Sequence, residues 1–98
     1  MIEIQFTAEF RAWLFGLKDV LTRQRLARRL EKAERGSLGD VKSVGSGIYE
    51  MREHFGPGWR MYYVRRGSMM IVMLGGGGKS SQSADISKAV KLAVTIED

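Results

Sequence analysis

The chain of 98 residues has no cysteine, one proline and one histidine. Without cysteine it has no disulfide framework, no thiolate metal site and no cysteine nucleophile. The single histidine, His54, excludes a ribonuclease mechanism that needs two. No run of about 18 apolar residues is present, so no membrane span is expected. The first ten residues, MIEIQFTAEF, lack the basic segment of a signal peptide, and the expected location is the cytoplasm.

The size and charge of the chain favour one small basic domain. Residues 1–98 are 44% hydrophobic, which is enough for one core and too short for two domains. Sixteen Lys and Arg against 11 Asp and Glu give a formal net charge of +5. Such a domain is biased toward polyanions, meaning nucleic acid or an acidic protein. The alternative is a basic surface that has no specific partner.

Hydrophobic periodicity predicts an α+β fold. Alternation over 1–6 predicts a strand, and helical spacing predicts one helix after Thr7 and a second from about Val20 to Glu34. From Asp40 onward the period changes to two, which predicts strands over 41–44, 48–55, 59–65 and 69–74. Their connections are too short for crossovers, so consecutive strands are antiparallel and the helices can pack against this meander. A last helix is predicted from Ser83 to about Val94.

The run GGGGKSS at 75–81 occupies the place of a phosphate-binding loop but departs from its pattern. The motif G-x-x-x-x-G-K-[ST] needs its first glycine at position 73, where this chain has Met73. The preceding strand is also predicted to be antiparallel rather than part of a β-α-β unit. We therefore interpret the run as a flexible exit from the last strand that lets Lys79 reach the polar face of the sheet.

Polar residues gather on one predicted face of the central strands. Alternation places Glu50, Arg52 and His54 together, and a hairpin brings the last two near Arg60. Lys79 approaches from the last strand. Arginine and lysine can hold phosphoryl oxygens, whereas His54 and Glu50 are candidate proton carriers. The set therefore suits attack of a ribose 2′-oxygen on the neighbouring phosphorus.

The alternative reading of this set is structural. Glu50 and Glu53 would pair with arginines across the strands, and His54 would be an ordinary residue at a strand end. A candidate RNA-binding surface lies on the polar side of the second helix and at one strand aromatic. Its members are Arg25, Arg28, Arg29, Lys32 and Tyr62. A solvated helix face and a packed aromatic ring are the alternatives there.

At these residues the chain resembles the RelE/ParE superfamily of small bacterial toxins, and within it the HigB-like addiction module killer proteins. The resembling features are F-x-x-W-L-x-x-L at Phe10–Leu17, Gly39-Asp40, Y-E-M-R-E-H-F-G-P-G-W-R-M-Y-Y at Tyr49–Tyr63, Lys79, and Asp85-Ile86 leading into A-x-x-x-A. The similarity covers nearly the whole chain, and the block from Tyr49 to Tyr63 is its most specific part.

The resemblance implies two N-terminal helices on a curved, mainly antiparallel sheet of four to five strands, followed here by a C-terminal helix. It implies a toxin that cleaves messenger RNA, often on the ribosome, and inhibits translation without a metal or other cofactor. By position, Arg52, Arg60 and Lys79 would carry the cleavage on a concave sheet face. No tyrosine follows Tyr63, where RelE uses a C-terminal one, so His54 would take over proton transfer.

The resemblance also implies a partner. HigB-like toxins are usually neutralised by a helix-turn-helix antitoxin, and the complex would repress its own operon while the toxin meets that DNA only through the antitoxin. ParE relatives share the fold, lack the nuclease residues and poison DNA gyrase. A third reading is an inert toxin fold that only binds its partner. The presence of Arg52, His54, Arg60 and Lys79 together favours RNA cleavage.

Overall fold

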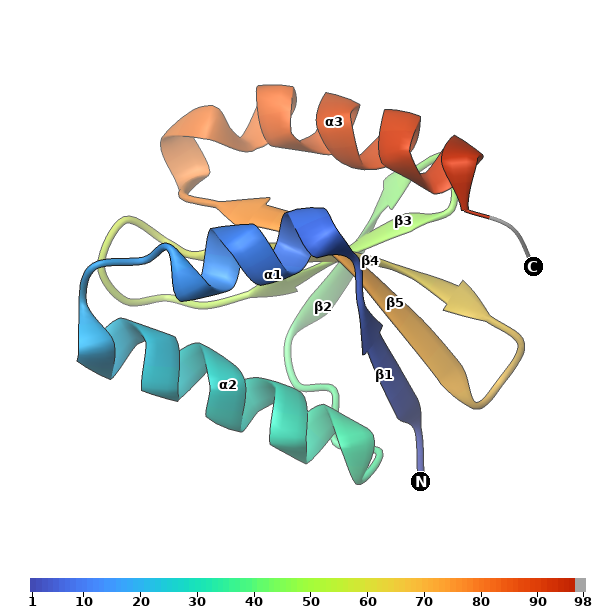
Figure 1. Ribbon diagram of the computed structural model, residues 1–98, viewed down its shortest axis with the longest axis horizontal. Coiled ribbons are helices and arrows are strands. Elements are labelled where there is room, and N and C mark those ends of the chain that lie inside the picture. Colours follow the sequence, from blue (N-terminus) through green and yellow to red (C-terminus); the bar gives the residue numbers. More distant parts are fainter. Residues whose placement is uncertain (97–98) are drawn as a thin grey trace.

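A computed structural model describes residues 1–96 as a five-stranded sheet with helices on both faces (Figure 1). The elements are, in order, β1 (Glu3–Phe6), α1 (Ala8–Phe15), α2 (Val20–Glu34), β2 (Val41–Gly45), β3 (Ile48–Arg52), β4 (Arg60–Arg66), β5 (Met70–Gly77), the short 3-10 helix η1 (Lys79–Ser81) and α3 (Gln82–Thr95). The predicted α+β class, the N-terminal helix pair and the C-terminal helix are confirmed. No helix within residues 1–96 is long and apolar enough to cross a bilayer.

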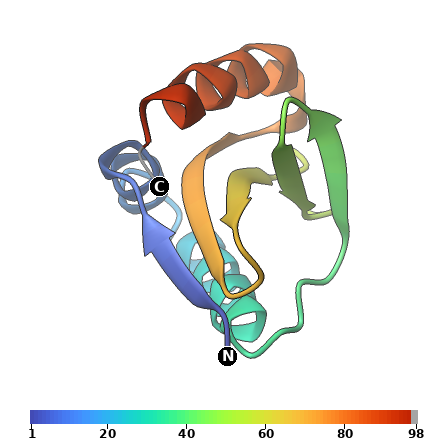
Figure 2. The ribbon, with the colours of Figure 1, turned by 90° about the vertical axis from the view of Figure 1, so that its right-hand side faces the viewer.

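The sheet has the order β1-β5-β4-β3-β2. The strands β2 to β5 form the predicted antiparallel meander. The first strand joins it on the far edge, parallel to β5, with Ile4 opposite Ile71. Figure 2 shows this N-terminal strand running beside the last one. The parallel pair joins residues about 67 positions apart, so local alternation gives no sign of it.

Two hydrophobic cores lie on opposite faces of the sheet. Helices α1 and α2 cover the first core, which consists of Phe10, Leu14, Leu26, Leu30, Ala33, Met51, Met61, Tyr63, Ile71 and Met73. Helix α3 covers the second, which consists of Ile48, Tyr62, Val64, Val72, Leu74 and Ala89. Alternation along β4 sends Met61 and Tyr63 to one core and Tyr62 and Val64 to the other. The central strands are therefore buried on both faces.

The strand β3 ends at Arg52 rather than at the predicted Phe55. The backbone N–H of Glu53 still donates to the carbonyl oxygen of Trp59 at 2.9 Å, and the residues between them form a loop in which the glycines at 56 and 58 take positive φ angles, 57° and 74°. The Nη1 atom of Arg60 also donates to the carbonyl oxygens of Glu53, Gly58 and Trp59, at 3.0, 3.1 and 3.2 Å. One guanidinium thus closes the loop into a compact turn.

The glycine run is strand rather than a flexible exit, and that interpretation is wrong. Gly75, Gly76 and Gly77 pair with Tyr62, Met61 and Arg60 and extend β5 three residues beyond the predicted end. The absence of side chains lets helices approach this strand from both faces. A Cβ on Gly76 would lie 2.5 Å from the ring of Trp13, and one on Gly77 would lie 2.0 Å from Oδ2 of Asp85.

This explanation predicts different effects for two neighbouring substitutions. Gly76→Ala pushes the Trp13 ring away and should lower the free energy of unfolding by about 1–3 kcal/mol. Gly75→Ala meets nothing within 4 Å and should change it by less than about 0.5 kcal/mol. Urea unfolding followed by circular dichroism measures both. Equal losses in the two variants would contradict the close approach of α1.

Candidate functional site

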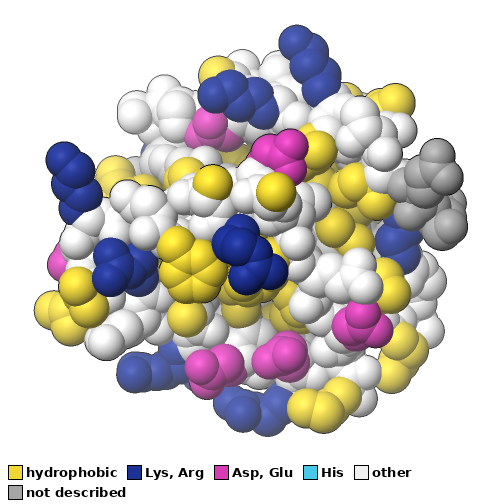
Figure 3. Space-filling view, viewed as in Figure 1, with side chains coloured by type: hydrophobic (Ala, Val, Ile, Leu, Met, Phe, Trp, Pro, Cys, Tyr) yellow, Lys and Arg dark blue, Asp and Glu magenta, His cyan; other side chains and the backbone are white. Residues whose placement is uncertain are grey.

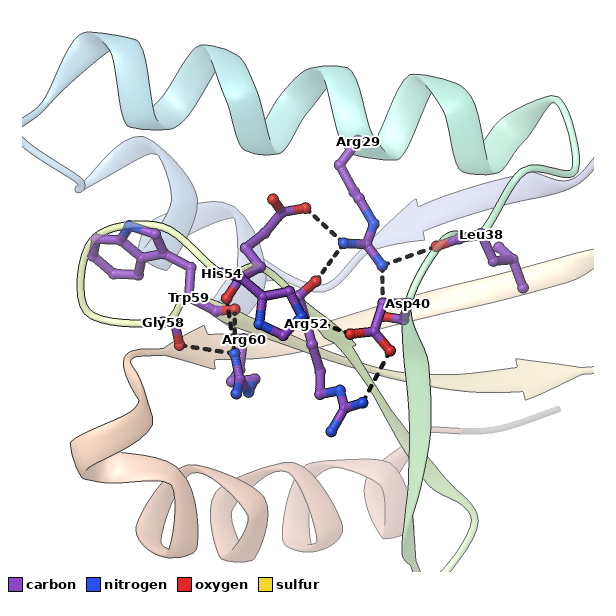
Figure 4. A network of polar contacts seen from close by, with 9 residues as sticks. Arg29, Leu38, Asp40, Arg52, His54, Gly58, Trp59 and Arg60 are labelled. Atoms are coloured by element: carbon purple, nitrogen blue, oxygen red, sulfur yellow. Dashed lines mark hydrogen bonds and ion pairs between the residues drawn. The ribbon is translucent and has the colours of Figure 1, made fainter.

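A cluster of three polar side chains lies where β2 begins and β3 ends (Figure 4). The carboxylate of Asp40 accepts a hydrogen bond from Nη2 of Arg52 on Oδ1, at 3.0 Å, and lies 2.8 Å from Nε2 of His54 on Oδ2. The exposed fraction of the side chains rises from 31% at Arg52 to 39% at Asp40 and 70% at His54. The cluster therefore opens toward solvent through the imidazole.

The strand register brings these residues together. The last β2–β3 pair is Val41 with Met51, so position 40 falls opposite position 52. The backbone N–H of Arg52 donates to the carbonyl oxygen of Asp40 at 2.9 Å, which continues the ladder by one step. His54 lies beyond the end of the strand and reaches back to the same carboxylate.

The charges of the cluster keep the carboxylate of Asp40 ionised. The hydrogen bond from Arg52 and then the one from His54 lower the pKa of Asp40 to about 2. The carboxylate in turn raises the pKa of Arg52 above its usual value. Because an ionised carboxylate only accepts hydrogen bonds, Nε2 of His54 must carry the proton between them. In neutral His54 the Nδ1 atom then holds the free lone pair.

Arg60 and Lys79 stand beside this cluster. Arg60 faces Arg52 across the β3–β4 ladder and is 6% exposed, with Nη1 committed to the loop carbonyls. Lys79 is exposed, and its backbone N–H donates to the carbonyl oxygen of Pro57 at 3.0 Å. A Cβ on Gly58 would lie 3.4 Å from that of Lys79, so the lysine lies against the same loop. The structure thus brings Arg52, Arg60 and Lys79 to one end of the sheet.

Glu50 and Tyr62 lie deeper, beneath α3. Glu50 shares a face with Arg52, as predicted, but it is 2% exposed and its Oε2 accepts from Nε2 of Gln82 at 2.8 Å. Tyr62 is fully buried, and its hydroxyl has no hydrogen-bond partner within residues 1–96. Burial raises the pKa of Tyr62, and the nearby charge of Glu50 adds to this effect. No base can stack on Tyr62 and no substrate can reach Glu50 while α3 is in place.

The basic residues of α2 divide into two groups. Arg28 and Lys32 are exposed, and Arg25 is exposed with its Cζ 3.7 Å from the ring centroid of Phe55. Arg29 differs, because its guanidinium points inward to the strand ends and the side chain is 12% exposed. Sequence periodicity groups it with the surface arginines and misses this role. Figure 3 shows Lys and Arg side chains spread over one face with Asp and Glu among them, rather than in one patch.

Asp40 was missed as a candidate site residue. A signal was present, because Gly39-Asp40 directly precedes a predicted strand that pairs with the one carrying Arg52. The charge pairing itself depends on register, which the sequence leaves open. Within the part of the chain that the structure describes, no group of three His, Asp or Glu side chains is placed to hold a metal ion.

Comparison of the sequence with known proteins establishes the family of the chain, and comparison of the structure with solved structures establishes its fold. No family model matches the chain. An uncharacterized protein of Haemophilus influenzae is 37% identical over 92 residues, which cover 94% of this chain and 93% of that protein. The chain belongs to the family of this Haemophilus protein.

Solved structures assign the fold of this family member. The Escherichia coli toxin RelE in the free state, as a variant with two arginines replaced by alanine, matches with a TM-score of 0.72 and 20% identity, covering 93% of this chain and 96% of that one. A conserved hypothetical protein of Helicobacter pylori matches with a TM-score of 0.54 and 17% identity, covering 82% and 97%. The predicted RelE-like fold is therefore confirmed, and the HigB-like branch stays a prediction.

The depressed pKa of Asp40 predicts a pH-dependent contribution to stability. Its bonds to Arg52 and His54 stabilise the folded chain fully above the ordinary pKa of 3.8 and are lost as the pH falls through about 2. The difference in melting temperature between the native chain and Asp40→Asn should thus have its full size at about pH 5 and shrink toward about pH 2. Thermal unfolding across this range checks it. A difference that does not change with pH would contradict the ion pair.

Proposed function

We propose that the chain is the toxin of a toxin–antitoxin pair and acts as a ribosome-dependent messenger-RNA endonuclease. The observation that carries this proposal is the pair formed by Asp40 and His54, with Arg52 on the same carboxylate and Lys79 at the same end of the sheet. The fold adds support, since a matching structure is that of a protein named as the toxin RelE.

The geometry suits transfer of a phosphoryl group within RNA. His54 is the general base, because its side chain is 70% exposed and its Nδ1, which Asp40 does not engage, can take the proton of a ribose 2′-hydroxyl. The 2′-oxygen then bonds to the adjacent phosphorus, the bond to the 5′-oxygen breaks, and that oxygen leaves with a proton from water. Asp40 holds the imidazole in one tautomer and stabilises its protonated form.

The cations of the site match the charge that develops in this reaction. Negative charge spreads over the phosphoryl oxygens in the transition state, where a guanidinium and an ammonium stabilise it. Arg52 and Lys79 are the accessible candidates, whereas Arg60 supports the loop behind them with Nη1. The reaction as drawn has no step that needs a metal ion or other cofactor.

The openness of the cluster supports dependence on the ribosome. A base that is 70% exposed gains little from desolvation, and so open a side chain offers RNA little surface within residues 1–96 that could orient it. A ribosome holding the messenger supplies both effects by bringing the scissile phosphate into position. A helix-turn-helix antitoxin is the expected inhibitory partner, and operon DNA would be met only through it.

Substitution of His54 tests the proposal directly. His54→Gln removes the base while the amide can still donate to Asp40, so the fold should be kept and cleavage of ribosome-bound messenger should fall by about 10²-fold or more. Primer extension after induction measures new RNA ends. Lys18→Ala, an exposed change in the α1–α2 connection, is the control and should cleave like the native chain.

Three outcomes separate the alternatives. Native-level cleavage by His54→Gln would contradict its role as base. Growth arrest without new RNA ends would reject the nuclease, and accumulation of cleaved plasmid with purified gyrase would then favour a ParE-like toxin. Normal growth with antitoxin binding intact would favour an inert toxin fold.

A further inference from the structure

Arg29 of α2 makes four hydrogen bonds with its two terminal nitrogens (Figure 4). Its Nη1 donates to the carbonyl oxygen of Arg52 and to Oε2 of Glu53, both at 2.6 Å. Its Nη2 donates to the carbonyl oxygens of Leu38 and Asp40, at 2.9 and 2.7 Å. The guanidinium is therefore committed to the protein on both arms and is not offered to a ligand.

The four acceptors belong to two chain segments that carry the site. Residues 38–40 lead into β2 and include Asp40, and residues 52–53 end β3 and precede His54. A planar guanidinium sets the distance and the angle between two groups of acceptors, because its N–H directions are rigidly fixed. One arm holds each segment, so Arg29 spans the gap across which Asp40 meets Arg52 and His54.

Strand pairing between β2 and β3 stops before these two segments, so other contacts must fix their relative position. The β2–β3 ladder has its last pair at Val41 and Met51, and Gly39, two residues before Val41, takes a positive φ of 71°. A Cβ on Gly39 would lie 3.2 Å from Nη2 of Arg29, so this glycine leaves room for the guanidinium. Besides the backbone bond from Arg52 to Asp40 and the two bonds onto the Asp40 carboxylate, the four bonds of Arg29 hold the two segments together.

We propose that Arg29 is a positioning residue that holds Asp40 in register with Arg52 and His54 and does not itself contact RNA. Its effect on catalysis rests on the proposed nuclease function, whereas its effect on the geometry of the cluster does not. The neighbouring Arg25, Arg28 and Lys32 are exposed and differ from it in this respect.

Arg29→Lys is the variant that separates positioning from charge. Lysine keeps the positive charge, but its donors spread from one nitrogen, so it cannot reproduce the two fixed arms with which Arg29 holds the two segments. Arg35→Lys makes the same exchange at the exposed C-terminal end of α2 and is the matched control. Both proteins are purified and first compared with the native chain by circular dichroism.

The first readout is NMR of the cluster, which needs no enzymatic activity. In Arg29→Lys the pKa of Asp40, followed through its carboxyl ¹³C signal, should rise from about 2 toward 3.8. His54 is the single histidine, so its ring ¹⁵N signals are read without ambiguity and should show loss of the fixed Nε2–H tautomer. Arg35→Lys should leave both unchanged. Unchanged signals in a folded Arg29→Lys protein would overturn the proposal.

The second readout is the kinetics of cleavage on programmed ribosomes. Misplacement of the base should lower kcat by about 10- to 100-fold with little change in KM. A raised KM with kcat unchanged would show that Arg29 binds RNA and would overturn the positioning role. If the native chain does not cleave RNA, the proposed function fails while the NMR test still decides the role of Arg29.

A second variant covers the case in which Arg29→Lys does not fold. Glu53→Gln removes the charge of one acceptor and leaves the other three bonds of Arg29 available. It should shift the same Asp40 and His54 signals in the same direction, by a smaller amount. Native signals in Glu53→Gln together with an unfolded Arg29→Lys would assign Arg29 to stability alone and overturn the proposal.

Discussion

Burial of β4 and β5 on both faces decides where polar chemistry can take place in this fold. Helices α1 and α2 close one face and α3 closes the other, so the middle of the sheet is apolar on both sides. A buried charge needs partners, and Glu50 and Arg60 find theirs in Gln82 and in the loop carbonyls. On the central strands, groups that must meet solvent therefore lie near the ends of the strands. The cluster around Asp40 occupies that position.

Much of the positive charge in this region is used to hold the protein together. Arg60 closes the loop over residues 53–59, Arg29 ties the strand ends, and Arg25 lies over Phe55. A guanidinium suits this work because it remains charged and donates in several fixed directions. A net charge of +5 therefore overstates the cationic surface open to RNA. Near the site, the partly exposed Arg52 and the exposed Lys79 are the cations that the proposed chemistry uses.

Local patterns predicted most of the fold because they report burial, and they failed where contacts are distant. Alternation located the meander, but it placed His54 on a strand that ends at Arg52, since the bonds from Arg60 that close the loop are invisible to periodicity. Helical spacing predicts that Arg29 faces solvent. It carries no information on the carbonyl oxygens of distant residues to which the guanidinium donates. The sequence predicts a loop at the glycine run for a similar reason. The glycines make room for the side chains of Trp13, on a helix distant in the sequence from Gly76, and Asp85, on a helix adjacent in space to Gly77.

The position of α3 changes how RNA is expected to approach. The resemblance implied binding on a concave sheet face, yet α3 covers the face that carries Glu50 and Tyr62. Exposure instead increases outward from Arg60 through Arg52 and Asp40 to His54, so the open route leads along the end of the sheet. A phosphate arriving by this route would meet the imidazole before any buried cation. In the proposed reaction the base can then act on RNA while α3 stays in place, and the exposed Arg28 and Lys32 of α2 stay candidates for contact with the flanking RNA.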